Sequence, residues 1–201
     1  MKCLGALLMV ALLPAAALAQ TLPAAFSVKG VAASDTLNIR AMPSAQADVL
    51  GEIGPYALNV EVLEFSGDGK WGKVGLPEGN GWVSMAYLDL IPQDDPHAVQ
   101  RPLSCFGTEP FWSVSLYARG AEFNSPETGA IPLTVTHEAV ASRGFLIQLE
   151  EGPTLNHTLI VTRKACSDGM SDRAYGFSTE LFTQAPDGNL AVDGCCTLDH
   201  R

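Results

Sequence analysis

Cysteines are the residues of this sequence best suited to covalent chemistry. Cys3 lies near the amino terminus, and the other four, Cys105, Cys166, Cys195 and Cys196, all follow residue 100. Adjacent residues on a strand point to opposite faces, so a bond between Cys195 and Cys196 would require strain. We therefore expect one of them to pair with Cys105 and the other with Cys166, with both assignments open. The alternative is a thiol or metal site, although no histidine stands at zinc-ligand spacing from these cysteines.

Glu109 is the carboxylate whose setting best suits acid catalysis. It stands close to Pro110 and Trp112, apolar neighbours of the kind that raise the pKa of a glycosidase acid. No second carboxylate is marked out as its partner, and no serine occupies a Gly-x-Ser-x-Gly turn. The histidines have no nucleophile signature beside them: His97, His137, His157 and His200. The sequence therefore predicts no catalytic residue and a protein that is not an enzyme.

The segment after Cys166 carries acidic residues that resemble cation ligands. Asp168 and Asp172, with serines between them, offer oxygen atoms of the kind that calcium binds. The segment lacks the alternating acidic positions of an EF-hand loop. We therefore expect a solvated turn closed by Gly169, with no metal ion and no cofactor.

Arg163, Lys164 and Arg173 form a basic cluster around this segment in an otherwise acidic chain. The simplest interpretation pairs them with Asp168, Asp172 or Glu109. The functional alternative makes the loop that contains Asp168, Asp172 and Arg173 a docking surface for an acidic partner.

The first 19 residues are predicted to be a signal peptide. Lys2 gives a positive start, and residues 4–13 form an apolar run too short to span a bilayer. Small residues then precede an expected cleavage site before Gln20. An uncleaved anchor is the alternative, which Pro14 disfavours. No later segment is apolar enough to cross a membrane, so we expect a protein that is periplasmic or secreted.

Export and charge together narrow the choice of partners. Cleavage would remove Lys2 and change the formal net charge from −10 to −11. A chain this acidic repels polyanions, which argues against nucleic acid or anionic lipid as a main partner. The exported environment is oxidising, and an even number of cysteines there favours disulfides. Each disulfide would stabilise the second half by about 4 kcal/mol in the chain-entropy model.

Short runs of alternating hydrophobicity, bounded by turn residues, predict strands almost throughout. In the first half these runs are residues 37–39, 58–65, 71–74 and 81–85. In the second half they are residues 111–117, 131–135, 145–149, 157–163, 175–183 and 190–192. Short helical turns are expected only near residues 45–49 or 85–88. Residues 92–102 are polar and rich in proline, which predicts a semi-rigid linker between domains at residues 26–91 and 103–201.

Two motifs of the first half, LNIRAMPS (residues 37–44) and GWVSMAYL (residues 81–88), resemble the opening and closing motifs of bacterial SH3-like domains. The resemblance implies a small β-barrel that binds peptidoglycan peptides or glycans. Met42 departs from the small residue usual before the proline, and the turn at residues 77–80 is longer than usual. Met42, Trp71 and Tyr87 are the expected ligand-binding residues. The alternative for Trp71, as for Trp82, is a place in the barrel core.

The second half carries the motifs GTEPFW (residues 107–112) and CSDGMSDR (residues 166–173), and it resembles an uncharacterised family of exported or lipoprotein-type bacterial domains. That family brings no established activity. Because meandering strands must close or pack in pairs to hide their edges, we expect a disulfide-braced antiparallel β-barrel or sandwich.

The fold class expected for the whole chain is therefore all-β, with a small SH3-like barrel followed by the disulfide-braced domain. The preferred function is non-catalytic binding in the cell envelope, with peptidoglycan or an envelope protein as partner. The alternatives are an inhibitor or accessory factor of a wall hydrolase, acting through the second domain, and a wall-degrading enzyme that uses Glu109. The oligomeric state is left open.

Overall fold

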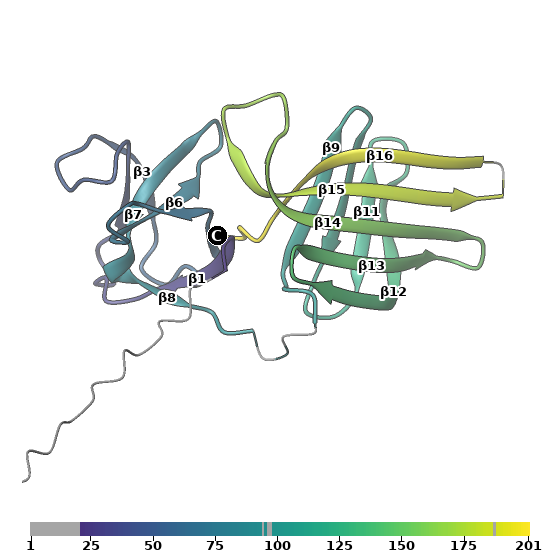
Figure 1. Cartoon of the computed structure of the whole chain (residues 1–201), viewed down its shortest axis with the longest axis horizontal. Helices are drawn as coiled ribbons and strands as arrows, with labels where there is room; N and C mark the ends of the chain where they lie inside the picture. The colour runs from purple at the N-terminus through teal and green to yellow at the C-terminus, as the bar shows by residue number, and fades with distance from the viewer. Residues whose placement is uncertain (1–20, 94, 96–97, 187) are drawn as a thin grey trace, which may run out of the picture.

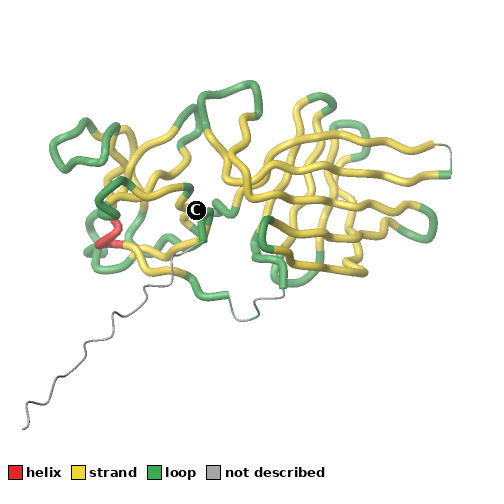
Figure 2. Tube along the Cα trace, in the orientation of Figure 1, coloured by secondary structure: helices red, strands yellow, loops and turns green. Residues whose placement is uncertain are grey.

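The computed structural model describes residues 21–93, 95, 98–186 and 188–201. The predicted signal peptide and residues 94, 96 and 97 of the predicted linker lie outside this range. Sixteen strands and one short 3-10 helix make up the secondary structure of the described residues, in two bodies that lie side by side (Figure 1). Figure 2 shows strands running through both bodies with short loops between them. The predicted all-β class is confirmed.

The amino-terminal half consists of two antiparallel sheets around one core. The first sheet has the order β4-β1-β8 and the second the order β3-β2-β7-β6-β5. The strands are β1 (Ala24–Val28), β2 (Leu37–Arg40), β3 (Val49–Ile53), β4 (Val60–Val62), β5 (Glu64–Phe65), β6 (Trp71–Gly75), β7 (Asn80–Ser84) and β8 (Leu88–Leu90). The 3-10 helix η1 (Met85–Tyr87) lies between β7 and β8. It confirms the helical turn expected near residues 85–88, whereas residues 45–49 form none.

Side chains that alternate between buried and exposed positions along the strands form this core. The core includes Val60, Val62 and Val74, which have no exposed surface. On β7 the side chain of Val83 is buried, whereas Trp82 and Ser84 lie on the half-exposed face, as the strand period of two requires. Residues of both sheets belong to the same hydrophobic cluster, so the two sheets form a single small domain.

The carboxy-terminal half is a closed barrel of eight antiparallel strands in sequence order, with β16 pairing back onto β9. The strands are β9 (Leu103–Thr108), β10 (Phe111–Leu116), β11 (Ala121–Ser125), β12 (Gly129–Ala141), β13 (Gly144–Glu151), β14 (Leu155–Ser167), β15 (Ala174–Ala185) and β16 (Gly188–Thr197). A barrel of this size has an interior just wide enough for side chains or for one small ligand. Closure removes the exposed edges that an open sheet of this length would present.

Two disulfides brace the barrel, Cys105–Cys196 and Cys166–Cys195. Cys196 stands directly opposite Cys105 in the β16–β9 register, and both side chains are buried in the core. Cys195 points to the other face of β16 and reaches Cys166 at the end of β14. The expectation that the adjacent cysteines bond to different partners is confirmed, and the structure supplies the assignment.

The end of the barrel that faces the amino-terminal half is filled by apolar side chains. Val99 of the linker and Leu198 of the carboxy-terminal tail are buried in the barrel core together with Ala25 of β1, and Ile91 packs against them. The opposite end carries the β9–β10, β11–β12, β13–β14 and β15–β16 turns. We call the two ends the proximal and distal ends of the barrel.

Candidate functional site

A groove of about 500 Å³ opens on the amino-terminal half beside Trp71. Its aromatic walls come from Trp71, the first residue of β6, and Tyr87 of the helix η1. These two elements are fixed to each other because Trp71 pairs with Ser84 in the β6–β7 register, and η1 follows Ser84 directly. Ser84 also lines the groove. The structure therefore brings together two of the three predicted ligand-binding residues.

The floor and rim of the Trp71 groove carry polar groups of both charges. Asn38 and Arg40 alternate on β2 with the buried residues Leu37 and Ile39, so their side chains lie on the groove side of the strand. Asp35 lines the groove from the preceding turn. The groove thus combines aromatic surface with one anionic and one cationic side chain.

Arg40 also holds the loop after β2. Its Nη1 atom donates a hydrogen bond to the Ala47 carbonyl at 2.8 Å. Met42, the third predicted ligand residue, is 62% exposed on this loop and does not line the groove. Trp82 lies elsewhere, with the Lys73 ammonium 5.9 Å from its ring centre.

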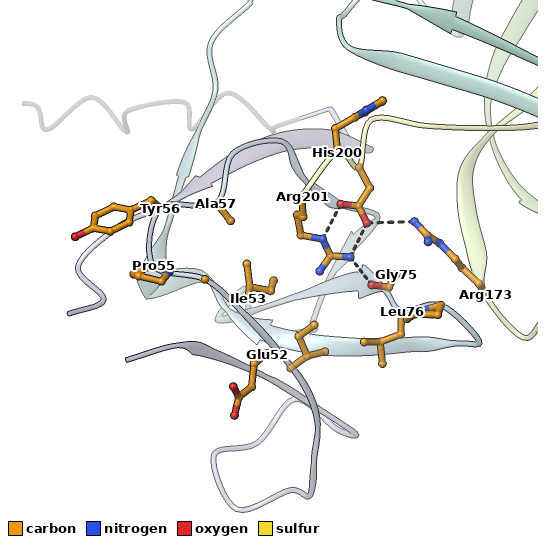
Figure 3. Close-up of a pocket in the computed structure, with 14 residues that line it drawn as sticks. Glu52, Ile53, Pro55, Tyr56, Ala57, Gly75, Leu76, Arg173, His200 and Arg201 are labelled. Carbon is orange, nitrogen blue, oxygen red and sulfur yellow. Dashed lines mark hydrogen bonds and ion pairs between the residues drawn. The ribbon is translucent and has the colours of Figure 1, made fainter. Parts of the chain in front are cut away.

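A second hollow, of about 750 Å³, lies between the amino-terminal half and the carboxy-terminal tail (Figure 3). One side is apolar and includes Ile53 and Leu76. On the other side Asp199 accepts hydrogen bonds from Arg201 Nε at 2.6 Å and from Arg173 Nη2 at 3.1 Å. Arg201 Nη2 donates to the Gly75 carbonyl at 2.6 Å. These contacts join the two halves, and we call this hollow the interdomain cleft.

Arg173 was expected to pair with Asp168, Asp172 or Glu109, and this prediction is wrong. Its guanidinium pairs with Asp199 and lies 4.9 Å from the Tyr175 ring centre. It also packs on Gly75, where an added Cβ would come within 2.7 Å of Arg173 Nε. The partner, Asp199, lies in the tail, far away in the sequence, so local spacing could not reveal it.

Arg163 was expected to pair with the same acidic residues, and this prediction is wrong too. Arg163 Nη1 donates to the Pro23 carbonyl at 3.1 Å, and its guanidinium lies 5.1 Å from the Phe145 ring centre. Burial lowers the pKa of Arg163 from its ordinary value. Arg163 thus contributes to the junction of the two halves and not to the loop.

Asp168 organises its own loop. Burial raises the pKa of its carboxyl group, but hydrogen bonds outweigh burial and leave this pKa below its ordinary value. The donors are the Met170 and Ser171 amides, each at 3.0 Å, the Ser171 hydroxyl and the Tyr175 hydroxyl. The side chain of Asp172 is exposed, and its carbonyl accepts a hydrogen bond from Asn80 Nδ2 at 3.0 Å. Among the described residues no three acidic, histidine or cysteine side chains form a cluster that would suit a metal ion.

The two motifs of the second half meet in a polar hollow of about 640 Å³. Its lining includes Glu109 from the β9–β10 turn, Asp168 from the loop, and the Cys166–Cys195 disulfide. Behind it the Trp112 ring covers Gly107, where an added Cβ would come within 2.2 Å of the indole Nε1. This close approach explains the glycine that opens the GTEPFW motif.

The first half matches a known family. Residues 35–89 match the family model of the bacterial SH3 domain. These residues form a bacterial SH3 domain. The match covers both motifs and all residues of the Trp71 groove from Asp35 onward. No curated protein and no solved structure matches the chain. The resemblance of the second half to an uncharacterised exported family stays a prediction.

A bacterial SH3 domain suggests a role in binding the cell wall or a peptide. Two disulfides are consistent with a protein outside the cytoplasm. Within the described part of the chain, no helix is long and apolar enough to cross a membrane.

Sequence reasoning missed several polar residues that line the groove of the SH3 domain, among them Asp35, Asn38 and Arg40. A signal for Asn38 and Arg40 was present, because they alternate with apolar Leu37 and Ile39 on a predicted strand. Their side chains must therefore face away from the core. Asp35 gave no such signal, since it precedes the strand.

Proposed function

We propose that this protein is a non-catalytic binding protein of the cell envelope, periplasmic or secreted, whose SH3 domain binds the peptide part of peptidoglycan in the Trp71 groove. The observation that carries the proposal is that Trp71 and Tyr87 line one groove together with Asp35 and Arg40. Export to an oxidising compartment is supported by the two disulfides.

The chemistry of a wall peptide suits this groove. Such peptides are short and carry both carboxylate and amino groups, so they need partners of both charges. Arg40 and Asp35 provide these charges, while Trp71 and Tyr87 provide amphipathic rings that bury surface at a small cost in side-chain entropy. Asn38 and Ser84 add groups that can bond to a peptide backbone.

Binding to purified sacculi tests the proposal, with Tyr87→Ala as the variant and Tyr56→Ala as its matched control. Tyr87 is 43% exposed and lines the groove, whereas Tyr56 is 75% exposed and lines the interdomain cleft. Because an aromatic anchor typically contributes 1–2 kcal/mol or more, we expect Tyr87→Ala to weaken binding about tenfold. Tyr56→Ala should leave binding unchanged.

The proposal fails if the wild-type protein is not enriched on sacculi over an unrelated protein of similar charge. Equal binding by both tyrosine variants and the wild type would remove the Trp71 groove as the site. Loss of binding in Tyr56→Ala alone would assign the ligand to the interdomain cleft instead.

A further inference from the structure

The distal end of the carboxy-terminal barrel is open and leads into a hollow of about 450 Å³. Leu181 and Trp112, both buried, form its inner wall. Phe111 and Leu190 stand at its rim and are 56% and 52% exposed. At the proximal end, by contrast, the tail and the linker fill the opening. We call the distal opening the barrel mouth.

Aromatic and aliphatic side chains dominate the barrel mouth. Three aromatic rings line it, those of Phe111, Trp112 and Phe123, and Leu190 and Val192 of β16 add aliphatic surface. Ligand sites in proteins are typically concave and apolar with few polar groups, and the mouths of small barrels are a common location. Exposed aromatic rings at a rim leave apolar surface in water that a ligand would cover.

The basic side chains of the barrel gather at its proximal end. After residue 102 the basic side chains are Arg119, Arg143, Arg163, Lys164, Arg173 and Arg201, all on proximal turns, the proximal part of β14 or the tail. At the distal end, Glu127 lies on the β11–β12 turn and Glu151 is the last residue of β13. Segments 103–116, 121–142, 144–162 and 174–200 contain no lysine or arginine. The potential at the barrel mouth is therefore negative.

A hydrogen-bonded trio of His157, Thr183 and Glu151 lies beside the mouth, with His157 buried. His157 is 3% exposed and its ring stacks on Phe123 with 5.6 Å between ring centres. Its Nδ1 is 2.9 Å from the Thr183 hydroxyl, and its Nε2 is 3.2 Å from a Glu151 carboxylate oxygen. Both Phe123 and Thr183 line the mouth. His157 thus packs on one wall of the mouth and is itself held in place by Thr183 and Glu151.

We propose that the barrel mouth binds a small hydrophobic cation, an amine with an aromatic or aliphatic body. The aromatic rings attract a cation through their faces, as in aromatic cages for ammonium groups, while the apolar walls cover the body of the ligand. Glu127, on the β11–β12 turn, supplies a carboxylate at the rim. The site is separate from the Trp71 groove and does not depend on the function proposed for the SH3 domain.

Three probes that share one body and differ in charge test this inference on the whole protein: phenylbutylamine, phenylbutanol and phenylbutyrate. Binding is followed by nuclear magnetic resonance, from shifts of the Leu190, Val192 and Thr183 signals. We expect the amine to bind best, the alcohol more weakly, and the carboxylate not at all. The signals of Trp71 and Tyr87 should not move, which separates this site from the groove.

Two variants and one control complete the design. Glu127→Gln should weaken binding of the amine about threefold to fivefold and leave the alcohol unchanged, because it removes one exposed charge. Phe111→Ala should weaken both probes, since it removes an aromatic wall. Glu180→Gln, an exposed carboxylate on the outer face of β15, is the matched control and should change neither affinity.

The inference is overturned if the amine gives no saturable shifts at the mouth up to its solubility limit. It is also overturned if the carboxylate probe binds as well as the amine, or if Glu180→Gln weakens the amine as much as Glu127→Gln does. Each of these outcomes would leave the sacculus experiment unaffected.

Discussion

Glu61 places a carboxyl group in the junction between the two halves. It stands on β4, is 3% exposed, and accepts hydrogen bonds from the Thr197 hydroxyl at 2.7 Å and the Leu198 amide at 3.0 Å. Burial raises the pKa of Glu61 from 4.5 to about 7, against these hydrogen bonds, which lower it. The protonated acid is therefore the form that the folded protein prefers below neutral pH.

Because the folded protein prefers protonated Glu61, its free energy of unfolding should fall as the pH rises towards 7. Glu61→Gln should remove this pH dependence. Between pH 4.5 and about 7 the unfolded chain has lost the Glu61 proton while the folded protein retains it. The contribution of Glu61 is therefore fully present below pH 4.5 and is lost as the pH rises through 7, by about 3 kcal/mol. Urea unfolding across this pH range measures it as the difference between wild type and Glu61→Gln.

Glu64→Gln is the matched control, because Glu64 is an exposed carboxylate on β5, the next strand along the chain. Its stability curve should follow that of the wild type. A Glu61→Gln curve parallel to the wild type from pH 4 to 8 would show that Glu61 does not titrate in this range.

The role of a side chain could be predicted from the sequence where its neighbours in the chain determine that role. Trp71 and Tyr87 were expected from the resemblance to bacterial SH3-like domains, and they do line one groove. The cysteine pattern followed from strand geometry alone. The partners of Glu61, Arg173 and His157 gave no signal, because they stand on other strands or in the tail. For such residues the type of side chain is visible in the sequence, but the contact that gives it a role is not.

At the scale of elements, alternation located strands but not their lengths. Strand β12 extends over Gly129–Ala141, against a predicted run of residues 131–135, because a bulge between Val135 and His137 shifts the pattern of alternation. Strand β14 likewise continues to Ser167 past an irregularity between Arg163 and Cys166. Closure of the barrel rests on the β16–β9 pairing between segments about 90 residues apart, which no local pattern encodes.

The two disulfides close loops of unequal length, which predicts unequal contributions to the stability of the barrel. Cys105–Cys196 spans 91 residues and Cys166–Cys195 spans 29. In the chain-entropy model these loops correspond to about 4.6 and about 3.6 kcal/mol. Replacing both cysteines of a pair by alanine should therefore destabilise the protein more for Cys105/Cys196. Urea unfolding of the two double variants compares them, and a larger loss for Cys166/Cys195 would contradict the prediction.

At the scale of the whole molecule, the tail after β16 connects the SH3 domain to the barrel. Leu198 is buried in the barrel core, the His200 amide donates to the Asn59 carbonyl at 3.2 Å, and Arg201 reaches the Gly75 carbonyl. Asn80, on the SH3 strand β7, donates to the Asp172 carbonyl and accepts from the Ala174 amide at 3.1 Å. These contacts fix the SH3 domain on the barrel with the Trp71 groove exposed.

Such a junction predicts that both halves unfold together, and Asn80→Ala tests it. Separate domains with few contacts would unfold in two steps, whereas this protein should show a single calorimetric transition. Asn80→Ala removes two hydrogen bonds across the junction, each contributing about 1 kcal/mol, and should lower the free energy of unfolding by about 2 kcal/mol. Asn124→Ala, an exposed position on β11, is the control and should have no effect. Two resolved transitions in the wild type would show that the halves fold independently. We expect stability to depend on the junction as well as on each core, because Glu61, the tail and Asn80 all lie between the same two halves.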